Sequence, residues 1–225
     1  MDKDDLIVRF AGEGGQGVVT SAEGLAQAAT QTGYNAQTFA TFPSQILGGP
    51  TWTQTRISVN PVLSSGDELD VLVCFNEQAY SNHNDSVSND GVIVYNSAEF
   101  ELPDQANAIG IDFDELAKST GNTRAANMVV IGALAELVAM KQDILDEFVT
   151  KKFTRGRPND EEIIESNIKA MGLGRTEVKQ RGISIGQLNP PQTPDYEQVL
   201  MNGNVAICLG AMHAGVNFYA GYPIS

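Results

Sequence analysis

The sequence predicts an α/β fold: a three-layer α/β/α sandwich with a parallel or mixed sheet, followed by a linker and the first helix and strand of a second α/β domain. Three observations predict it. An apolar run at residues 6–10 leads through a glycine-rich segment into a helical pattern that lasts to about Thr32. Further short apolar runs follow, of the kind that are buried as strands. From Thr123 the pattern becomes helical, as expected for helices that cover a sheet.

The individual elements follow from apolar periodicity and from glycine and proline at their ends. Strands are expected at residues 6–11, 35–41, 52–59, 70–75, 91–95 and 108–111. Helices are expected at residues 17–32, 78–87, 126–137, 143–152 and 159–171. Beyond these, residues 200–215 are expected to form a helix and residues 216–221 a strand. One helix and one strand cannot bury a core, so this last part belongs to something larger.

The chain is therefore divided into a domain of residues 1–181, a proline-rich linker of residues 182–197 and the incomplete start of another domain at residues 198–225. The formal net charge of −14 argues against a nucleic-acid partner, which needs a basic face. The segment 198–225 has no charged residue, but polar residues interrupt it, so a membrane span is not expected. The N-terminus has no basic region of a secretory signal, and we expect a cytoplasmic protein.

Few residues suggest catalysis or metal binding. The two cysteines, Cys74 and Cys208, are far apart and form no C-x-x-C pair, so no metal or iron–sulfur site is expected from this chain alone. The two histidines, His83 and His213, have no nucleophile or metal ligand near them in the sequence. We expect both at the surface or hydrogen-bonded in the core, and no catalytic residue within the chain.

The glycine-rich segment after the first strand has the spacing G-x-G-x-x-G, which is typical of dinucleotide sites. A site for NAD would need an acidic residue near the end of the second strand, yet no Asp or Glu occurs between Glu23 and Arg56. The lysine of a P-loop is also absent. The glycines are then either a tight packing turn or a phosphate-binding loop. The candidate cofactor-binding residues are Gly12, Gly14, Gly15, Gln16 and Gly17.

Residues 24–55 contain no Asp, Glu, Lys or Arg, although the chain is otherwise rich in acid. This stretch includes a loop bounded by prolines at 43 and 50. Depletion of charge marks the core of interfaces, and a loop rich in glycine and proline packs poorly as core. We favour an interface with a partner over a loop that folds back on its own domain. The candidate interface residues are Phe42, Pro43, Ile46, Gly48, Gly49 and Pro50.

These segments together resemble the γ domain of the 2-oxoacid:ferredoxin oxidoreductases. The resemblance rests on the segments 12–17, 42–50, 55–58 and 127–134, and it covers about residues 5–175. Residues 203–211 and 218–225 resemble the start of the α domain of the same enzymes, and a γ domain fused to an α domain is often found in the 2-oxoglutarate type. The resemblance implies that the chain is the front piece of a longer polypeptide, or is processed from one.

The resemblance implies that the assembled enzyme decarboxylates a 2-oxoacid on thiamine diphosphate, reduces ferredoxin through iron–sulfur clusters and forms an acyl-CoA. A β subunit would hold the diphosphate and Mg²⁺, so the chain belongs to a hetero-oligomer and is inactive alone. Ser225 occupies the position of a family hydroxyl that helps to bind substrate. The γ domain would be mainly structural and would help to enclose coenzyme A through its glycine loop. Several relatives have a basic residue where this chain has Leu47, so any ion pair of that residue is missing here.

Two other interpretations stay open at this point. One is a stand-alone oxidoreductase of Rossmann type that binds NAD(P). The other is an interaction module without enzymatic activity. The resemblance favours the oxidoreductase complex, and the fused order favours 2-oxoglutarate as its substrate.

Overall fold

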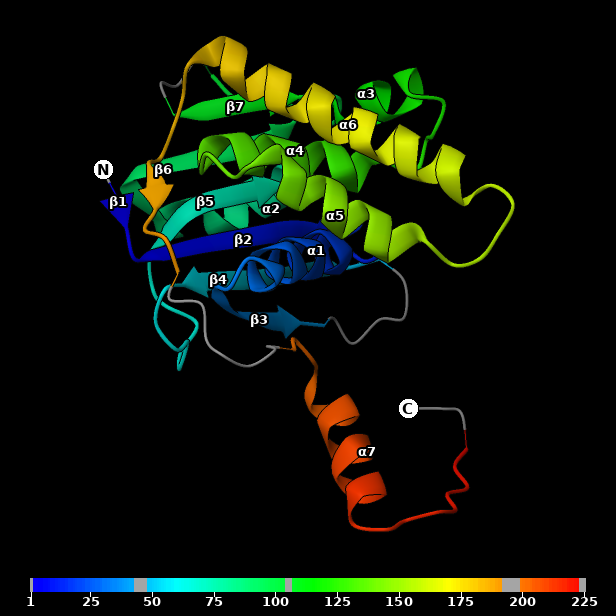
Figure 1. Cartoon of the computed structure of the whole chain (residues 1–225). Coiled ribbons are helices and arrows are strands. Elements are labelled where there is room, and N and C mark those ends of the chain that lie inside the picture. The colour runs from blue at the N-terminus through cyan, green and yellow to red at the C-terminus, as the bar shows by residue number, and fades with distance from the viewer. Residues whose placement is uncertain (1, 43–47, 104–106, 192–198, 223–225) are drawn as a thin grey trace.

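The computed structural model describes residues 2–42, 48–103, 107–191 and 199–222, and its main body is an α/β sandwich (Figure 1). The central sheet has six strands in the order β3-β4-β2-β5-β6-β7. Their bounds are β2 Asp5–Glu13, β3 Asn35–Thr41, β4 Pro50–Ser58, β5 Leu69–Cys74, β6 Val87–Asn96 and β7 Ala108–Ile111. Strands β2, β5, β6 and β7 are parallel, and β4 runs antiparallel to its neighbours β2 and β3. The sheet is therefore mixed.

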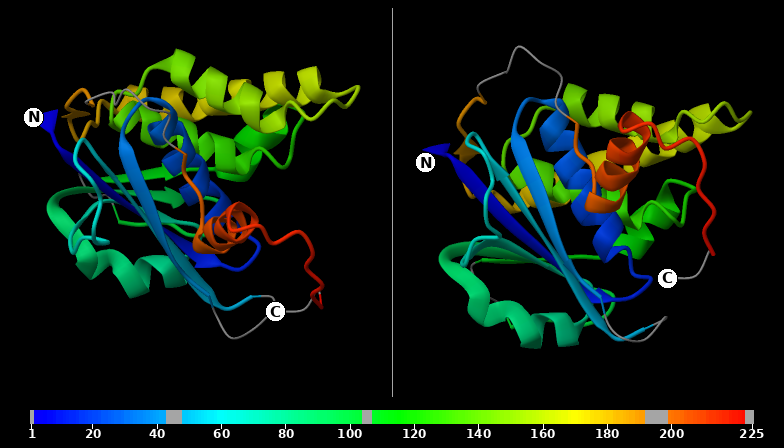
Figure 2. Two further views of the ribbon diagram at one scale, coloured as in Figure 1. Left: turned by 60° about the horizontal axis from the view of Figure 1, so that its bottom comes forward. Right: turned by 90° about the horizontal axis from the view of Figure 1, so that it is seen from below.

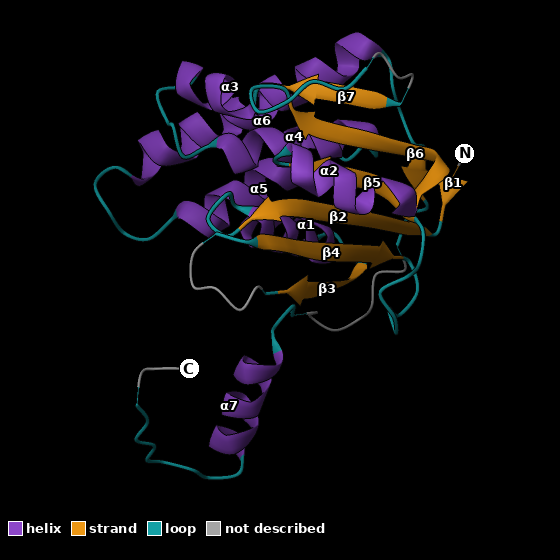
Figure 3. Ribbon diagram, turned by 180° about the vertical axis from the view of Figure 1, so that it is seen from behind, coloured by secondary structure: helices purple, strands orange, loops and turns teal. Residues whose placement is uncertain are grey.

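Helices cover both faces of the sheet, as the two views of Figure 2 show. Five of them lie on one face: α1 Val18–Gln31, α3 Phe113–Ser119, α4 Ala126–Leu137, α5 Gln142–Phe153 and α6 Asp160–Arg181. The other face carries α2, Glu77–His83, which continues into a short 3-10 turn at Asn84–Ser86 and is seen from behind in Figure 3. The expected three-layer α/β/α class is confirmed.

The core lies mainly between the sheet and the five-helix layer. Parallel strands covered on both faces need nearly continuous apolar sequence, and β5 meets this need because Val71, Leu72, Val73 and Cys74 are all fully buried. Part of the charge-free stretch is explained in the same way. Most of its residues in α1, including Leu25 and Ala29, are buried. Burial therefore accounts for the lack of charge at these positions.

The close contact between α4 and α6 is made possible by glycines. Helices α4 and α6 cross so closely that a Cβ atom on Gly132 would lie 2.0 Å from the carbonyl oxygen of Met171. A Cβ atom on Gly174 would lie 2.0 Å from the carbonyl oxygen of Val129. Both positions therefore need glycine, and α6 continues to Arg181, ten residues beyond the expected end at 171.

The segment expected to be a linker packs against the domain in its first part. Strand β8, Gln187–Leu188, pairs in parallel with β1, Asp2–Lys3, in a separate two-stranded sheet. The N–H of Asn189 donates to the carbonyl of Lys3 at 2.8 Å, and its side-chain amide donates to Asp4 at 2.8 Å. Leu188 is buried. This small sheet holds the chain after α6 beside the N-terminal strand.

Beyond residue 198 the chain forms one helix, α7, Gly203–His213, capped by Asn202, whose side chain accepts from the N–H of Val205. None of its residues is buried, and Figure 1 shows it apart from the sheet. The strand expected at residues 216–221 is not formed. An extended apolar segment becomes a strand only when it pairs with another, and nothing in the described part of the chain pairs with it.

Candidate functional site

The glycine-rich segment lies at the carboxyl ends of the central strands β2 and β5. From β2 the chain passes through α1 on one face to reach β3, and from β5 it passes through α2 on the opposite face to reach β6. The two connections thus diverge between β2 and β5. In open α/β sheets ligands bind in the crevice at such a point. The structure therefore places the predicted loop where a ligand site is expected.

The loop keeps its shape because larger residues do not fit. Gly15 and Gly17 have φ angles of +100° and +87°, which side chains with a Cβ rarely adopt. A Cβ on Gly12 would lie 2.9 Å from the Cβ of Phe75, and one on Gly17 would lie 2.1 Å from the side-chain oxygen of Asn127. Close packing thus accounts for Gly12 and Gly17. Gly14, by contrast, has room for a Cβ, since its nearest neighbour there is 3.5 Å away in Gly48.

Gln16 holds the loop in shape through its side chain. Its side-chain oxygen accepts from the N–H of Glu13 at 2.7 Å and from the side-chain amide of Asn76 at 3.1 Å. Asn76 in turn caps α2 by accepting from the N–H of Ala79 at 2.9 Å. One side chain therefore ties the end of β2 to the end of β5. Sequence reasoning missed this role because Asn76 is sixty residues away.

The glycine loop and the predicted interface loop meet. The N–H of Gly14 donates to the carbonyl of Gly49 at 3.4 Å. Gly48 and Gly49 both have positive φ angles, of 73° and 79°. Phe42 is 74% exposed, and Pro50 is exposed at the start of β4. Pro43, Ile46 and Leu47 of this loop lie outside the described residues, as does Ser225.

The two loops enclose a small cavity of about 290 Å³. Its walls are Glu13, Gly14, Gly15, Gly17, Val18, Val19, Thr20, Phe42, Gly48 and Thr51. Three of the predicted residues of the glycine loop, Gly14, Gly15 and Gly17, and two of the predicted interface, Phe42 and Gly48, thus share one cavity. Its size is near the lower end for small-molecule sites, so it suits part of a ligand better than a whole cofactor.

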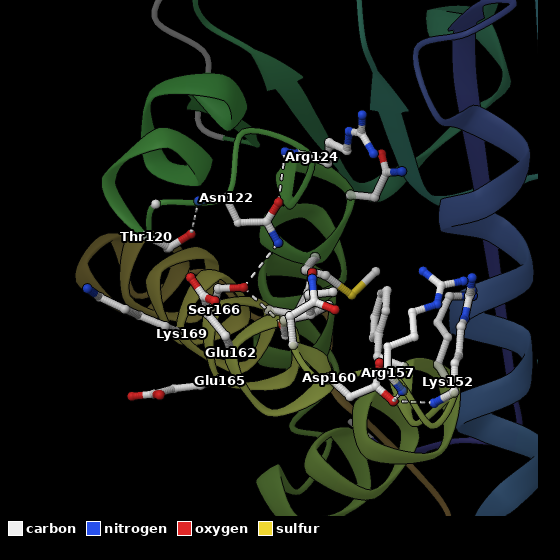
Figure 4. Close-up of a pocket in the computed structure, with 18 of the residues that line it drawn as sticks. Thr120, Asn122, Arg124, Lys152, Arg157, Asp160, Glu162, Glu165, Ser166 and Lys169 are labelled. Carbon is white, nitrogen blue, oxygen red and sulfur yellow. Dashed lines mark hydrogen bonds between the residues drawn. The ribbon is translucent and has the colours of Figure 1, made fainter.

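A larger cavity of about 750 Å³ lies nearby, among the ends of α3, α4, α5 and α6 (Figure 4). Thr20 lines both cavities. The larger one has cationic walls: Arg124, Lys152, Arg155, Arg157 and Lys169. It escaped sequence reasoning because these residues come from separate helices, although the cluster of basic residues at 151–157 in an acidic chain was a visible signal.

Lys152 shows the electrostatic character of this cavity. Its ammonium group lies over the ring of Phe148, 5.4 Å from the centroid. Burial lowers the pKa of Lys152, the charge of Glu23 opposes this, and the nearby Arg155 lowers the pKa further. The cavity therefore holds positive charge that is partly removed from water.

Besides the two cavities, a cluster of polar side chains lies on the α2 face of the sheet. The guanidinium of Arg9 donates twice to the side-chain oxygen of Gln54, at 3.0 and 2.7 Å, and lies over the ring of Trp52. It also lies 3.3 Å from Nδ1 of His83. Burial, and then the charge of Arg9, lower the pKa of His83. His83 is thus a hydrogen-bonded, half-buried residue, whereas His213 is exposed on α7.

The cysteines lie in unlike surroundings. Cys74 is buried in β5, and burial raises its pKa to about 12, so the thiol is inert. Cys208 is exposed on α7. Among the residues that the structure describes, no three His, Cys, Asp or Glu side chains gather as metal ligands. In those same parts of the chain, no helix has the length and apolar character needed to cross a membrane.

Comparison with known proteins gives consistent matches. Residues 7–177 match the family model for pyruvate ferredoxin/flavodoxin oxidoreductase. The ketoisovalerate oxidoreductase subunit VorA of Methanothermobacter thermautotrophicus is 32% identical over 174 residues, which are 76% of this chain and 36% of that protein. The 2-oxoglutarate oxidoreductase subunit KorA of Mycobacterium tuberculosis is 25% identical over 261 residues, covering 98% of this chain and 38% of KorA. This chain thus spans little more than a third of the length of these relatives.

Solved structures extend the likeness. The 2-oxoglutarate:ferredoxin oxidoreductase from Magnetococcus marinus, solved with 2-oxoglutarate, coenzyme A and succinyl-CoA bound, superposes with a TM-score of 0.85 at 33% identity. The match covers 100% of this chain and 40% of that one. A keto/oxoacid ferredoxin oxidoreductase γ subunit from Geobacter sulfurreducens shares the fold, with a TM-score of 0.67 over 80% of this chain and 99% of that one at 23% identity. The match of the family model over most of the sequence means that this chain belongs to the pyruvate ferredoxin/flavodoxin oxidoreductase family.

Proposed function

We propose that this chain is the γ region, joined to the start of an α domain, of an oxidoreductase that converts 2-oxoglutarate to an acyl-CoA and reduces ferredoxin. One observation carries the proposal. The structure from Magnetococcus marinus matches the whole chain, including α7, whereas the separate γ subunit matches only 80% of it. The fused order of the two parts is the reason for choosing 2-oxoglutarate among 2-oxoacids. The proposal keeps the cytoplasmic location expected from the sequence.

The proposed enzyme needs groups that this chain does not hold. Thiamine diphosphate with Mg²⁺ supplies the carbanion chemistry of decarboxylation, and iron–sulfur clusters carry the electrons. The two cysteines do not fit a cluster site, because Cys74 is buried in the sheet and Cys208 lies on the exposed α7. We therefore assign both groups to a β subunit in a hetero-oligomer, with ferredoxin as the electron acceptor. Ser225 stays a proposed substrate-binding residue.

Within this assembly we assign the chain a binding and positioning role. The cavity between the glycine loop and Phe42 would enclose the uncharged arm of coenzyme A. Gln16 fixes the loop at the end of β2 against Asn76 at the end of β5, so the cavity keeps its shape before the ligand arrives. A preformed site binds more tightly because less ordering is needed on binding. The exposed Phe42 and Pro50, together with the partly buried Gly48, would form part of the contact with the other domains.

The activity is tested by purifying the complex through a tag on this chain. We expect a cluster-bearing subunit to copurify and a viologen dye to be reduced only when 2-oxoglutarate and coenzyme A are both present. Pyruvate and 2-oxoisovalerate serve as competing substrates, and a preference for either would contradict the choice of 2-oxoglutarate. A preparation without a cluster-bearing partner that reduces NAD(P) by itself would overturn the proposal as a whole.

The role of the loop is tested separately with Gly14→Val. A side chain fits at Gly14 without the clashes found at Gly12 and Gly17, so the variant fills the cavity and leaves the fold intact. We expect a higher KM for coenzyme A with an unchanged melting temperature. Gly172→Ala, at a helical position in α6 with open space around it, is the control. An unchanged KM in Gly14→Val would mean that the loop does not touch coenzyme A.

A further inference from the structure

We infer that two copies of this chain associate through the outer edge of β3, so that their central sheets join into one continuous sheet. Strand β3 lies at one edge of the six-stranded sheet and β7 at the other (Figure 1). The outer side of an edge strand has unpaired backbone N–H and C=O groups, to which a strand of another chain can bind. Most proteins block such edges, for example by short edge strands or charged side chains. The two edges of this sheet differ in that respect.

The β7 edge is blocked. Strand β7 has only four residues. The carbonyl of Ile111 accepts from the N–H of Ser97, which follows β6, at 3.1 Å, so the carbonyl of the preceding Gly110 points outward. The guanidinium of Arg181 donates to this outward carbonyl at 2.8 Å and also pairs with Glu177. A charged side chain from α6 thus covers this edge and hinders pairing with another strand.

The β3 edge has no such protection. Its seven residues, Asn35–Thr41, include no charged residue, proline or glycine, and they pair with β4 in unbroken register. Gln37 and Ala40 are exposed, and Phe39 is only half-buried. Across the parts of the chain that the structure describes, no strand pairs with the outer side of β3. A long, neutral and regular edge of this kind is expected to pair with another strand.

The hydrogen bonds of β4 indicate which backbone groups of β3 point outward. The N–H of Trp52 on β4 points toward β3, where it donates to the hydroxyl of Thr41 at 3.2 Å. Alternate residues of a strand direct their backbone groups to opposite sides, so the even-numbered residues of β4 all face β3. The odd-numbered residues of β3 lie opposite them and face back toward β4. The outward backbone groups therefore belong to the three even-numbered residues of β3, Ala36, Thr38 and Ala40.

The distribution of charge indicates that the second strand comes from another copy of the chain. Each copy carries a net charge of −14, so two copies repel one another unless they meet at a neutral surface. Residues 24–55, which include β3, have no charged side chain. The one charged residue of β4, Arg56, is paired with Asp5 at 2.9 Å. A different partner would be recognised by complementary charges, and this edge offers none, whereas two identical neutral edges meet without repulsion.

A two-fold axis at Thr38 pairs all seven residues of one β3 with all seven of the other. Thr38 then lies opposite its own copy, and the outward groups of Ala36 meet those of Ala40. Opposed threonines stabilise an antiparallel pair, and no like charges meet. Seven residue pairs make a small interface, so we expect a weak dimer that forms as the concentration rises.

Hydrogen exchange of the 225-residue chain locates the contact, after sedimentation velocity has measured the dissociation constant of the dimer. At a chain concentration ten times that constant, about a fifth of the chains are monomeric. The amides of Ala36, Thr38 and Ala40 should then exchange about fivefold more slowly than in dilute solution. An edge covered by another segment of the same chain would be protected equally at all concentrations. That result overturns the inference, and so does an edge that is unprotected at every concentration.

Thr38→Lys and Thr38→Glu test the two-fold axis. Each variant alone sets like charges opposite one another, and we expect association that is weaker by about fivefold or more. An equal mixture of the two variants sets a lysine opposite a glutamate and should restore association close to that of the wild type. The controls Ser119→Lys and Ser119→Glu, at an exposed position of α3, make the same changes of charge away from β3. They should associate like the wild type, both alone and mixed.

A wild-type chain that stays monomeric at all concentrations overturns the inference. So does association that is unchanged in both Thr38 variants, because the contact would then lie elsewhere, for example at the exposed apolar residues of α7. Melting curves establish that the variants are folded, and a mixture of folded variants that fails to associate excludes the axis at Thr38. Self-association of this kind is independent of the proposed function, because it needs neither substrate nor another subunit.

Discussion

The crossing of α4 and α6 allows one sharp prediction about stability, because two glycines in α6 lie in opposite surroundings. A Cβ on Gly174 would lie 2.0 Å from the carbonyl oxygen of Val129 and 3.0 Å from the N of Ala133. A Cβ on Gly172, two residues earlier in the same helix, would meet nothing within 4 Å. The same substitution to alanine should therefore have opposite effects at the two positions.

The magnitude follows from the geometry. Ordinary contact of a Cβ begins at 3.4 Å, so in Gly174→Ala the helices must move apart by about 1.4 Å, the difference between 3.4 and 2.0 Å. Overpacking of a core costs about 1–3 kcal/mol, and the upper end applies here because the opposing atoms are backbone and cannot rotate away. The higher helix propensity of alanine returns about 1 kcal/mol. The net loss is about 2 kcal/mol, or roughly 4–8 °C in melting temperature for a chain of this size.

Thermal and urea unfolding of the two variants measure the difference directly. Gly172→Ala should raise the free energy of unfolding by about 1 kcal/mol, since only the propensity changes. If Gly174→Ala unfolds at the same temperature as Gly172→Ala or above it, the helices do not approach as closely as described. A decrease in both variants would instead show that glycine is needed in α6 for a reason other than this contact.

Three further predictions concern the polar groups. Gln16→Leu should lower the free energy of unfolding by about 1–2 kcal/mol in urea titrations, because two hydrogen bonds are lost, whereas Gln16→Glu keeps the acceptor for Asn76 and should change it much less. The pKa of His83 is below its ordinary 6.5 in the folded chain, so the unfolded chain binds the proton first and stability should fall as the pH drops below about 6.5. His83→Asn should reduce that slope between pH 7 and 5, and an unchanged slope would exclude this histidine as its source. Ellman's reagent should react quickly with the exposed Cys208, and with Cys74 only after unfolding; fast reaction of both would contradict the burial of Cys74.

The parts of the fold that local patterns determine could be predicted from the sequence. Strand β5 was evident because its apolar run is continuous, and the glycine loop because its spacing matches a known turn. The end of α6 could not be predicted, since residues 172–181 are mostly polar and their packing depends on the contact of Gly174 with α4 and on the burial of Val178. The pairing of β1 with β8 joins two-residue strands from opposite ends of the domain, and such short segments carry no periodicity.

The candidate site shows the same division. The sequence indicated the glycine loop as a candidate site, but the contact of Gln16 with Asn76 exists only because the fold brings the two residues together. The cationic cavity depends on four helix ends, none of which is notable alone. Conversely, the pattern of residues 216–221 predicted a strand that is not formed, because a strand must pair with another strand and none in the described part of the chain is beside it. Contacts between segments that are distant in the sequence are thus the part of the site that could not be predicted.

The pairing of β8 with β1 has a mechanical consequence for α7. It anchors the chain at Asn189 to the N-terminal strand, so the path to α7 starts from a fixed point on the domain surface. From Pro191 to Val199 there are eight residue steps, which span at most about 28 Å when fully extended. Two parts of a chain joined by so few residues meet at an effective concentration on the order of millimolar. Docking of α7 beside this domain would then depend little on how much protein the cell contains.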